Sequence, residues 1–303
     1  MKHLIILNGR AGEGTAINHV NEIEKAFKNL DAEIHYTSAP GEATTFLRSY
    51  LANETNHVRV YACGGDGTLN ECLNGIVGHD NVELAVYAIG TGNDFVKIYG
   101  GKERFMNLEN IINGTIEKVD ISKIEAPTLE TPLYSINAIN VGFDAYVGHY
   151  GNIYKEKGKK DPYDKGLVPA IFKNRFNKIQ ITVDGERITK KKMLMCNFCH
   201  GQYIGGKFKT APRSVNTDGL LEVCLVNCVS LFTFLNVLGP FTKGEHLDSP
   251  KFSKYFTYRR ATEIEIESKK DTVLCIDGEI IQGSKFLIKV LPAAINFVVP
   301  KGE

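Results

Sequence analysis

Short apolar runs alternate with helix-like patterns over the first 120 residues of the chain. Four of these runs have the length of buried strands, at residues 3–7, 33–37, 58–62 and 82–89. Apolar residues three or four positions apart predict the intervening helices, at residues 20–30, 43–51 and 69–77. Strands that alternate with helices in this way predict a doubly wound parallel α/β sheet with helices on both faces.

The rhythm of the pattern changes near residue 120. The later apolar runs are mostly short and strand-like, at residues 135–141, 178–183, 192–198, 219–226, 263–267, 272–276 and 285–290. Only residues 165–176 and 231–238 have a helical pattern. We therefore expect an α/β domain over residues 1–122 and a mostly antiparallel β domain over residues 123–292. The end of the chain, residues 293–303, is expected to return to the first domain.

The composition is typical of a globular protein, with 43% hydrophobic and 23% charged residues. The longest apolar stretches, residues 4–7 and 231–241, are shorter than the ~20 residues that a membrane-spanning helix needs. The start of the chain does not resemble a signal peptide, because its short apolar run leads directly into a glycine-rich turn. Seven cysteines without framework spacing are expected to be reduced. We therefore expect a cytoplasmic protein.

The net charge is only +1, but it is unevenly distributed. Residues 1–150 hold 11 basic and 19 acidic residues, and residues 151–303 hold 25 and 16, which gives −8 and +9. The basic excess is concentrated in residues 155–192. A pI near 7.6 argues against a nucleic-acid partner, whereas a locally basic face fits an anionic membrane surface or substrate. The alternative is a solvated lysine-rich loop.

Three polar glycine-rich turns follow predicted strands, at residues 8–14, 64–68 and 90–94. Ligands of parallel α/β sheets bind at the carboxyl ends of the strands, where glycine allows backbone N–H groups to approach phosphate oxygens. A tight turn also needs glycine without any ligand, and neither Rossmann nor Walker A spacing is present. Three such turns at one sheet edge nevertheless favour a phosphate site.

Carboxylates accompany these turns. Asp66 and Asp94 lie in two of them, and Asp120 follows the apolar residues of another short run. Because carboxylates repel phosphate, we expect the three to converge on a hydrated Mg²⁺ ion. The alternative role of Asp66 or Thr68 is to cap the following helix.

Residues 64–68, GGDGT, resemble the signature of the diacylglycerol kinase catalytic-domain family. That family belongs to the superfamily of sphingosine kinases, NAD kinases and phosphofructokinases. Further segments resemble its motifs in the same order, at residues 90–95, 140–144, 205–206, 211–212, 218–221 and 275–279. The resemblance covers nearly the whole chain and is closest in layout to the bacterial soluble lipid kinases.

The resemblance implies a two-domain kinase with a phosphofructokinase-like first domain and ATP bound between the domains. The implied nucleotide-site residues are Asn8, Gly9, Arg10, Ala11, Gly12, Thr37, Gly64, Gly65, Asp66, Gly67, Thr68, Leu69, Asn70, Glu71, Thr91 and Asn93. Asp66, Asp94 and Asp120 would organise the catalytic Mg²⁺. The first turn departs from the family pattern, because it lacks a serine at residue 11, and Arg10 could supply a replacement phosphate donor.

The resemblance also implies a base and a structural metal in the second domain. Asp277 or Glu279 would accept the proton of the lipid hydroxyl, and we favour Asp277 because it directly follows an apolar strand. The same tripeptide at residues 184–186 shows that Asp-Gly-Glu alone is weak evidence. The structural Mg²⁺ would be held by the Asp218 side chain and by the carbonyl groups of Val215 and Leu220. Thr217 stands where the family often has another Asp, which removes one charge near that ion.

We therefore expect an ATP- and Mg²⁺-dependent lipid kinase, with Phe143, Asp144 and Tyr146 near an apolar acceptor groove. The basic loop at residues 155–165 and the apolar stretch at residues 231–241 would dock it peripherally on anionic lipid. The apolar stretch could instead be a helix that packs on the β domain. Exposed sheet edges could also pair in a homodimer. The alternative functions are a kinase for a soluble acceptor such as NAD and a non-catalytic nucleotide- or lipid-binding protein.

Overall fold

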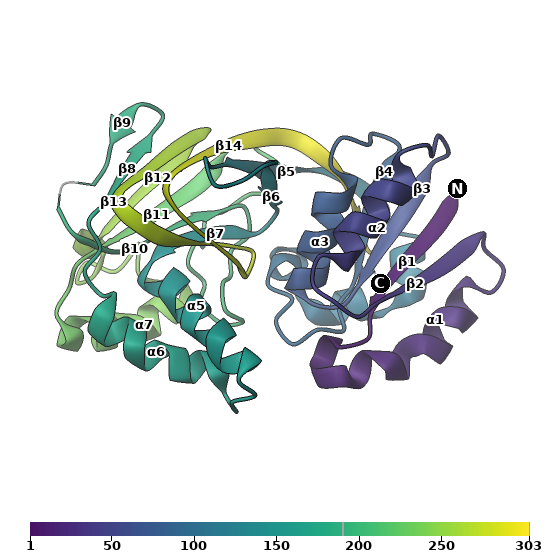
Figure 1. Ribbon diagram of the computed structural model, residues 1–303, viewed down its shortest axis with the longest axis horizontal. Helices are drawn as coiled ribbons and strands as arrows, with labels where there is room; N and C mark the ends of the chain where they lie inside the picture. The colour runs from purple at the N-terminus through teal and green to yellow at the C-terminus, as the bar shows by residue number, and fades with distance from the viewer. Residues whose placement is uncertain (190, 303) are drawn as a thin grey trace. The chain divides into compact units, whose positions relative to one another are not determined.

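The computed structural model describes residues 1–189 and 191–302 and divides the chain into two compact units. Unit 1 comprises Met1–Ile121 and Pro292–Glu303, and unit 2 comprises Ser122–Leu291. These bounds lie within one residue of those expected from the sequence. The chain passes between the units within β5 (Thr115–Glu125) and again within β14 (Glu279–Val299) (Figure 1).

Unit 1 is the expected parallel α/β domain. Its strands are β1 (Lys2–Asn8), β2 (Ala32–Thr37), β3 (Val58–Cys63) and β4 (Val82–Tyr87), in the parallel order β4-β3-β1-β2. The end of β14 adds to this sheet, because Asn296 and Phe297 pair in parallel with β4. The returning segment thus extends the sheet of unit 1, as the sequence predicts.

Helices cover both faces of this sheet. The α-helices are α1 (Val20–Phe27), α2 (Glu42–Leu51), α3 (Asp66–Ile76) and α4 (Leu108–Ile112), and the 3₁₀ helices are η1 (Ala11–His19), η2 (Phe95–Tyr99) and η3 (Lys102–Met106). Ile23 and Phe27 of α1 pack with Ile5 and Tyr61 of the strands. α2 and α3 lie on the opposite face from α1 (Figure 1). Successive side chains of a strand point to opposite faces of the sheet, so the apolar residues of each strand contact the helices on both faces.

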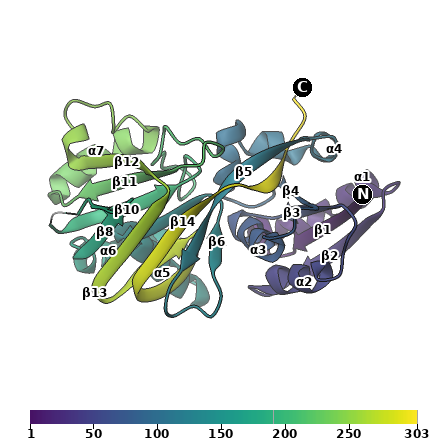
Figure 2. The same ribbon diagram turned by 90° about the horizontal axis from the view of Figure 1, so that it is seen from above.

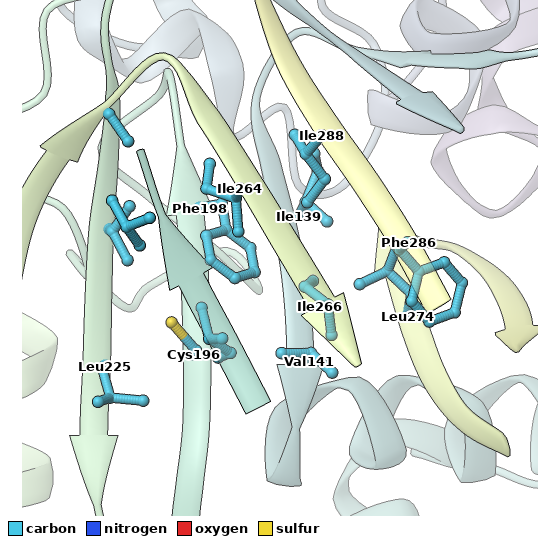
Figure 3. Packing of buried hydrophobic residues seen from close by; sticks show 14 of the residues in the cluster. Ile139, Val141, Cys196, Phe198, Leu225, Ile264, Ile266, Leu274, Phe286 and Ile288 are labelled. Carbon is cyan, nitrogen blue, oxygen red and sulfur yellow. The ribbon is translucent and has the colours of Figure 1, made fainter. Parts of the chain in front are cut away.

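Unit 2 is mostly antiparallel β structure. Its strands are β6 (Leu133–Ser135), β7 (Ala138–Gly142), β8 (Ile179–Val183), β9 (Glu186–Arg187), β10 (Met193–Cys199), β11 (Leu221–Asn227), β12 (Phe256–Ala261) and β13 (Glu263–Ile276), with the first part of β14. The antiparallel order is β12-β11-β10-β7-β13-β14, and β8 pairs with β13. Figure 2 shows β13 and β14 running side by side. One core cluster of unit 2 contains Ile139, Phe198 and Ile264 (Figure 3), and a second contains Ala170 and Val237 of its helices.

Several predicted boundaries differ in unit 2. Residues 263–276 form one strand with an irregularity between Glu267 and Thr272, not two strands. Residues 133–142 form two strands where one was predicted, and β12 was not predicted. The helices α6 (Pro162–Lys173) and α7 (Leu231–Lys243) confirm the two helical predictions. No helix within the described ranges has the length and apolar character needed to cross a membrane.

The helix α5 (Phe143–Glu156) was missed because its sequence is rich in glycine and tyrosine. Its glycines serve close helix packing. A Cβ atom on Gly166 of α6 would lie 2.7 Å from the carbonyl oxygen of Val147, and one on Gly151 would overlap the ring of Tyr163. Glycine, which lowers intrinsic helix stability, is therefore retained here because it allows α5 and α6 to approach closely.

Candidate active site

The turns after β3 and β4 are locked together. The Gly64 N–H donates to the carbonyl of Tyr87 (3.1 Å), and the Gly90 N–H donates to the carbonyl of Gly64 (2.9 Å). A Cβ atom on Gly90 would lie 2.3 Å from the Cα of Gly65, closer than real atoms pack. The Asn93 side chain, on a residue with φ +49°, donates a further bond to the Gly64 carbonyl (3.0 Å). Glycine is therefore required where the two turns touch.

We expect Gly90→Ala to lower the free energy of unfolding by about 3 kcal/mol or more, because the added methyl group overlaps backbone atoms. Gly67→Ala is the matched control. Gly67 lies in the first turn of α3, and a methyl group added there would have nothing within 4 Å, so this change should cost nothing or stabilise the helix by up to about 1 kcal/mol. Urea unfolding of both variants measures the difference. Equal midpoints for the two would show that the contact between the turns is not required.

Asp66 joins the two turns at the start of α3. Its Oδ1 accepts a hydrogen bond from the backbone N–H of Asp94 (2.6 Å). A Cβ atom on Gly92 would lie 2.6 Å from Asp66 Oδ2, so the second turn closes tightly over the carboxylate. The Asp94 side chain is buried and pairs with Lys97 Nζ (2.5 Å). The structure therefore brings Asp66 and Asp94 together, with the charge of Asp94 balanced by a lysine.

The structure does not gather Asp66, Asp94 and Asp120 as three direct ligands of one metal ion. Asp120 is 1% exposed, and its Oδ1 accepts the N–H of Ala293 in β14 (2.8 Å). The strand β14 pairs with both β4 and β5, so it separates the strand of Asp120 from β4. Within residues 1–189 and 191–302, no three His, Cys, Asp or Glu side chains gather as a metal site. Asp120 instead holds the bend of β14, whose Ala293 has φ +50°.

The turn after β1 contacts the start of α3. The Asn8 side chain donates to Thr68 Oγ1 (3.1 Å) and accepts the N–H of Arg10 (3.0 Å). Thr37, at the end of β2, pairs in register with Asn8. Ala11 and Gly12 begin the 3₁₀ helix η1, and Arg10 is exposed. The ends of β1, β2 and β3 therefore meet at one edge, as the sequence predicts.

Four of the other predicted nucleotide residues have distinct surroundings. Leu69 and Asn70 are buried within α3, and the carbonyl of Asn70 accepts a bond from the Asn74 side chain (2.9 Å). The carboxylate of Glu71 accepts the N–H of Ala43 at the start of α2 (3.1 Å). Glu71 therefore contributes to the packing of α3 against α2. Thr91 is exposed in the turn after β4.

In unit 2, Asp277 forms the turn between β13 and β14, with φ +48°. Its carboxylate accepts bonds from Ser135 Oγ (2.8 Å) and from the backbone N–H groups of Ile136 (2.9 Å), Asn137 (3.1 Å) and Ala138 (2.8 Å). These four hydrogen bonds occupy both oxygens of the carboxylate. The preference for Asp277 as base is therefore not supported, because this side chain fastens the loop between β6 and β7.

The second Asp-Gly-Glu tripeptide uses its aspartate in the same way. Asp184 has φ +46°, and its Oδ1 accepts the N–H groups of Thr262 (3.1 Å) and Glu263 (2.8 Å). In both copies of the tripeptide, the aspartate has a positive φ and its carboxylate accepts backbone N–H groups, so the repeat indicates a turn between strands. Glu279, in contrast, is exposed at the start of β14, opposite Ile276. Burial, together with the nearby Cys275 and Glu279, raises the pKa of Tyr163 of α6.

Asp144 lies in the first turn of α5 in a polar cluster of unit 2. Its carboxylate accepts a bond from the Asn140 side chain (2.9 Å) and from the N–H of Ala145 (3.0 Å). Burial raises its pKa to about 7. A carboxyl group of this kind changes its charge near neutral pH and can exchange a proton with a nearby hydroxyl.

The raised pKa of Asp144 predicts a pH-dependent stability. The folded protein holds this proton more tightly than the unfolded chain, whose pKa is near 3.8, so stability should fall as pH rises from about 4 to about 7. Each pH unit in that window costs about 1.4 kcal/mol at most. Asp144→Asn should lack this decline and be more stable than the wild type at pH 8. Urea unfolding at pH 5 and pH 8 measures it, and an equal decline in both proteins would exclude the effect.

The residues predicted to hold a structural Mg²⁺ do not fit a metal. Asp218 Oδ1 accepts the N–H of Leu220 (3.0 Å), and Oδ2 contacts the guanidinium of Arg260 from β12. Arg260 also contacts Glu222 (3.1 Å), and Val215 is exposed. An arginine therefore supplies the positive charge next to Asp218, at the place where the sequence predicted an ion.

We accordingly expect the thermal midpoint of the wild type to change by less than about 1 °C with EDTA or with added Mg²⁺ in the absence of nucleotide. Arg260→Gln should lower the midpoint, because it leaves Asp218 and Glu222 without their cation. A wild-type midpoint that falls clearly in EDTA and recovers with Mg²⁺ would restore the structural metal.

Two family profiles match the chain. The profile described as "Diacylglycerol kinase catalytic domain" matches residues 2–124, and "YegS C-terminal NAD kinase beta sandwich-like domain" matches residues 137–299. The chain is 26% identical over 284 residues to "Diacylglycerol kinase" of Bacillus subtilis (strain 168), covering 91% of this chain and 88% of the relative. It is 28% identical over 305 residues to "Probable lipid kinase YegS-like" of Shewanella frigidimarina (strain NCIMB 400), covering 98% and 93%.

The fold is similar to that of solved structures. A crystal structure of a diacylglycerol kinase from Bacillus anthracis str. Sterne superposes with a TM-score of 0.70 at 20% identity, over 98% of this chain and 96% of that chain. At this identity the similarity establishes the fold alone. It agrees with the arrangement predicted from the sequence, a parallel α/β domain followed by a mostly antiparallel β domain.

Proposed function

The chain belongs to the lipid kinase family that joins a diacylglycerol kinase catalytic domain to a YegS C-terminal domain, and we propose that it transfers the γ-phosphate of ATP to a lipid hydroxyl. The observation that carries the proposal is the pair of interlocked glycine turns with Asp66 at the start of α3. Relatives over nearly the whole chain are named as kinases of diacylglycerol or lipid, which supports an acceptor of that class.

The phosphates of ATP would lie against the turns of unit 1. The start of α3 offers backbone N–H groups and the positive end of the helix dipole to an anion. A Cβ atom added to Gly9 or to Gly67 would have no atom within 4 Å, so a phosphate could approach the backbone at both residues. The role assigned to these turns is therefore to bind the phosphates of the nucleotide.

The residues of unit 1 fit a magnesium ion that is held mainly by nucleotide. Mg²⁺ commonly takes one or two protein carboxylates, with phosphate oxygens and waters as its other ligands. Asp66 would hold the ion, since the carboxylate of Asp94 is paired with Lys97. When bound, the ion would neutralise charge on the phosphates. The fixed hydrogen bond from the Asp94 N–H orients the Asp66 carboxylate for this role.

We assign the base to Glu279. The lipid hydroxyl oxygen forms a bond to the γ-phosphorus as the bond to the ADP oxygen breaks, and the hydroxyl proton passes to a carboxylate. Glu279 is exposed at the end of a hairpin that Asp277 fixes in place. The exposed side chain of Glu279 is accessible to a substrate, and Asp277 fastens the loop before β7. Asp277 is therefore a positioning residue for Glu279.

The experiment offers γ-labelled ATP and Mg²⁺ to the wild type with a panel of acceptors in mixed micelles. The panel contains diacylglycerol, a sphingoid base, a polyprenol and phosphatidylglycerol, with NAD in a parallel reaction without micelles. Label in a lipid that increases with its mole fraction in the micelle supports the proposal. Label in NAD alone would move the acceptor to the soluble class. ATP binding without transfer to any acceptor would favour a binding protein.

A further inference from the structure

We propose that α6 and α7 of unit 2 form a face that docks on the surface of an anionic lipid bilayer. The proposal rests on the proposed function and deepens it, because a kinase that phosphorylates a lipid must reach its acceptor in a bilayer. We call the exposed side chains of residues 163–176 and 231–235 the helical face.

Exposed apolar side chains are concentrated on the helical face. Of the fifteen large apolar side chains that are exposed among the described residues, eight belong to it: Tyr163, Leu167, Val168, Phe172, Phe176, Leu231, Phe232 and Leu235. Phe172 is 83% exposed and Phe232 is 78% exposed. Apolar surface gathered in this way marks an interaction site, whereas single exposed residues do not.

The two helices contribute to one surface. Their inner sides pack into the same cluster, where Ala170 of α6 and Val237 of α7 join Leu194 and Met195 of β10. The end of α6 lies next to the start of α7, since Cys228 Sγ is 4.0 Å from the carbonyl oxygen of Arg175. Both helices lie on the same side of the unit 2 sheet (Figure 1). Phe172 and Phe232 are thus exposed residues of two helices that pack on the same cluster of unit 2.

The charged residues around the helical face indicate which class of partner binds there. Residues 163–183 contain four basic residues, Lys165, Lys173, Arg175 and Lys178, and one acidic residue, Asp164. The three lysines are exposed. Residues 228–244 contain one lysine and no acidic residue. Basic side chains around exposed aromatic rings match the anionic headgroups and the acyl boundary of a bilayer. A second copy would bring like charges together, which opposes self-association through this face.

Phe176 connects the apolar and basic parts. The guanidinium of Arg175 lies 4.6 Å from the centre of its ring, and Lys192 Nζ lies 5.5 Å from it. Cations held beside a half-exposed ring can meet phosphate groups while the ring enters the headgroup region. The lysines of the loop before α6, Lys157, Lys159 and Lys160, are also exposed and extend the basic side. These short helices lie at the surface of unit 2, so the docking is peripheral.

The test is co-sedimentation with vesicles, without nucleotide, so that its result does not depend on kinase activity. The wild type is compared with Phe172→Ser/Phe232→Ser, with Lys173→Glu/Lys178→Glu and with a control, Leu30→Ser/Ile116→Ser, that removes two exposed apolar residues from unit 1. Vesicles contain phosphatidylcholine alone or with phosphatidylglycerol. All altered side chains are exposed, and circular dichroism checks the fold of each variant.

We expect at least about 10-fold weaker binding to the phosphatidylglycerol vesicles for each helical-face variant and less than a 2-fold change for the control. Binding by the wild type should weaken with salt and be weaker on phosphatidylcholine alone. Unchanged binding by both helical-face variants would overturn the proposal. So would a wild-type dimer in sedimentation velocity that these variants dissociate while no vesicle binding is seen. A protein that binds vesicles through this face but labels no lipid would retain the docking proposal and lose the kinase proposal.

Discussion

Asp66→Ala is expected to reduce phosphoryl transfer from ATP by about 10²–10³-fold without unfolding the protein. The substitution removes the carboxylate that we assign to Mg²⁺ and the acceptor of the Asp94 N–H. Asp66→Asn separates these effects, because an amide oxygen can still accept that bond but carries no charge. We expect both variants to be inactive and Asp66→Asn to remain as stable as the wild type.

The control for charge is Asp31→Asn, which removes an exposed carboxylate from the same unit. Its transfer rate should be unchanged. Initial rates with γ-labelled ATP measure all three variants at one protein concentration. An Asp66→Asn variant with more than about a third of the wild-type rate would mean that the charge of Asp66 is not needed, contrary to the assigned metal role.

We expect Glu279→Gln to lower mainly kcat and Asp277→Asn to lower mainly the free energy of unfolding. Glu279→Gln removes the assigned base and should lower kcat by about 10²–10⁴-fold with little change in stability, since the side chain is exposed. Asp277→Asn places an amide group where four donors point and should lower the free energy of unfolding by about 3 kcal/mol or more. Its loss of activity should follow from displacement of the hairpin.

The pair is measured by urea unfolding and by kcat, with the pH dependence of kcat as a second readout. Glu279→Gln should abolish the acidic limb of the wild-type profile, and Asp277→Asn should retain it with whatever activity remains. The reverse outcome, a stable and inactive Asp277→Asn beside an active Glu279→Gln, would return the base to Asp277.

Much of the architecture could be predicted from local pattern. The strands of unit 1 are short and continuous in apolar residues, because both faces are buried, and helical spacing follows between them. The local pattern did not predict α5, because Gly151 allows close contact with α6 and does not mark a turn. It also could not show that the two halves of β13 are one strand, because the charged residues between them stay in extended backbone.

The parts of the candidate site that lie within the turns after the parallel strands could be predicted from the sequence. Asp66, Gly64 and Gly90 meet because parallel strands end at one edge of the sheet. The rest depends on partners far away in the sequence. Asp120 is held by Ala293, Asp277 by the loop before β7, and Asp218 by Arg260. The presence of a carboxylate in a motif does not show whether its partner is a metal ion, backbone N–H groups or an arginine.

We assign the metal-binding carboxylate to Asp66 and the base to Glu279 for transfer of phosphate from ATP to a lipid. The most direct measurement is the initial rate of label transfer from γ-labelled ATP to lipid in mixed micelles with Mg²⁺, for the wild type, Asp66→Asn and Glu279→Gln together. We predict labelled lipid with the wild type, which disappears without Mg²⁺, and almost none with either variant. Label that enters only NAD, or lipid labelling at wild-type rates by both variants, would contradict the account.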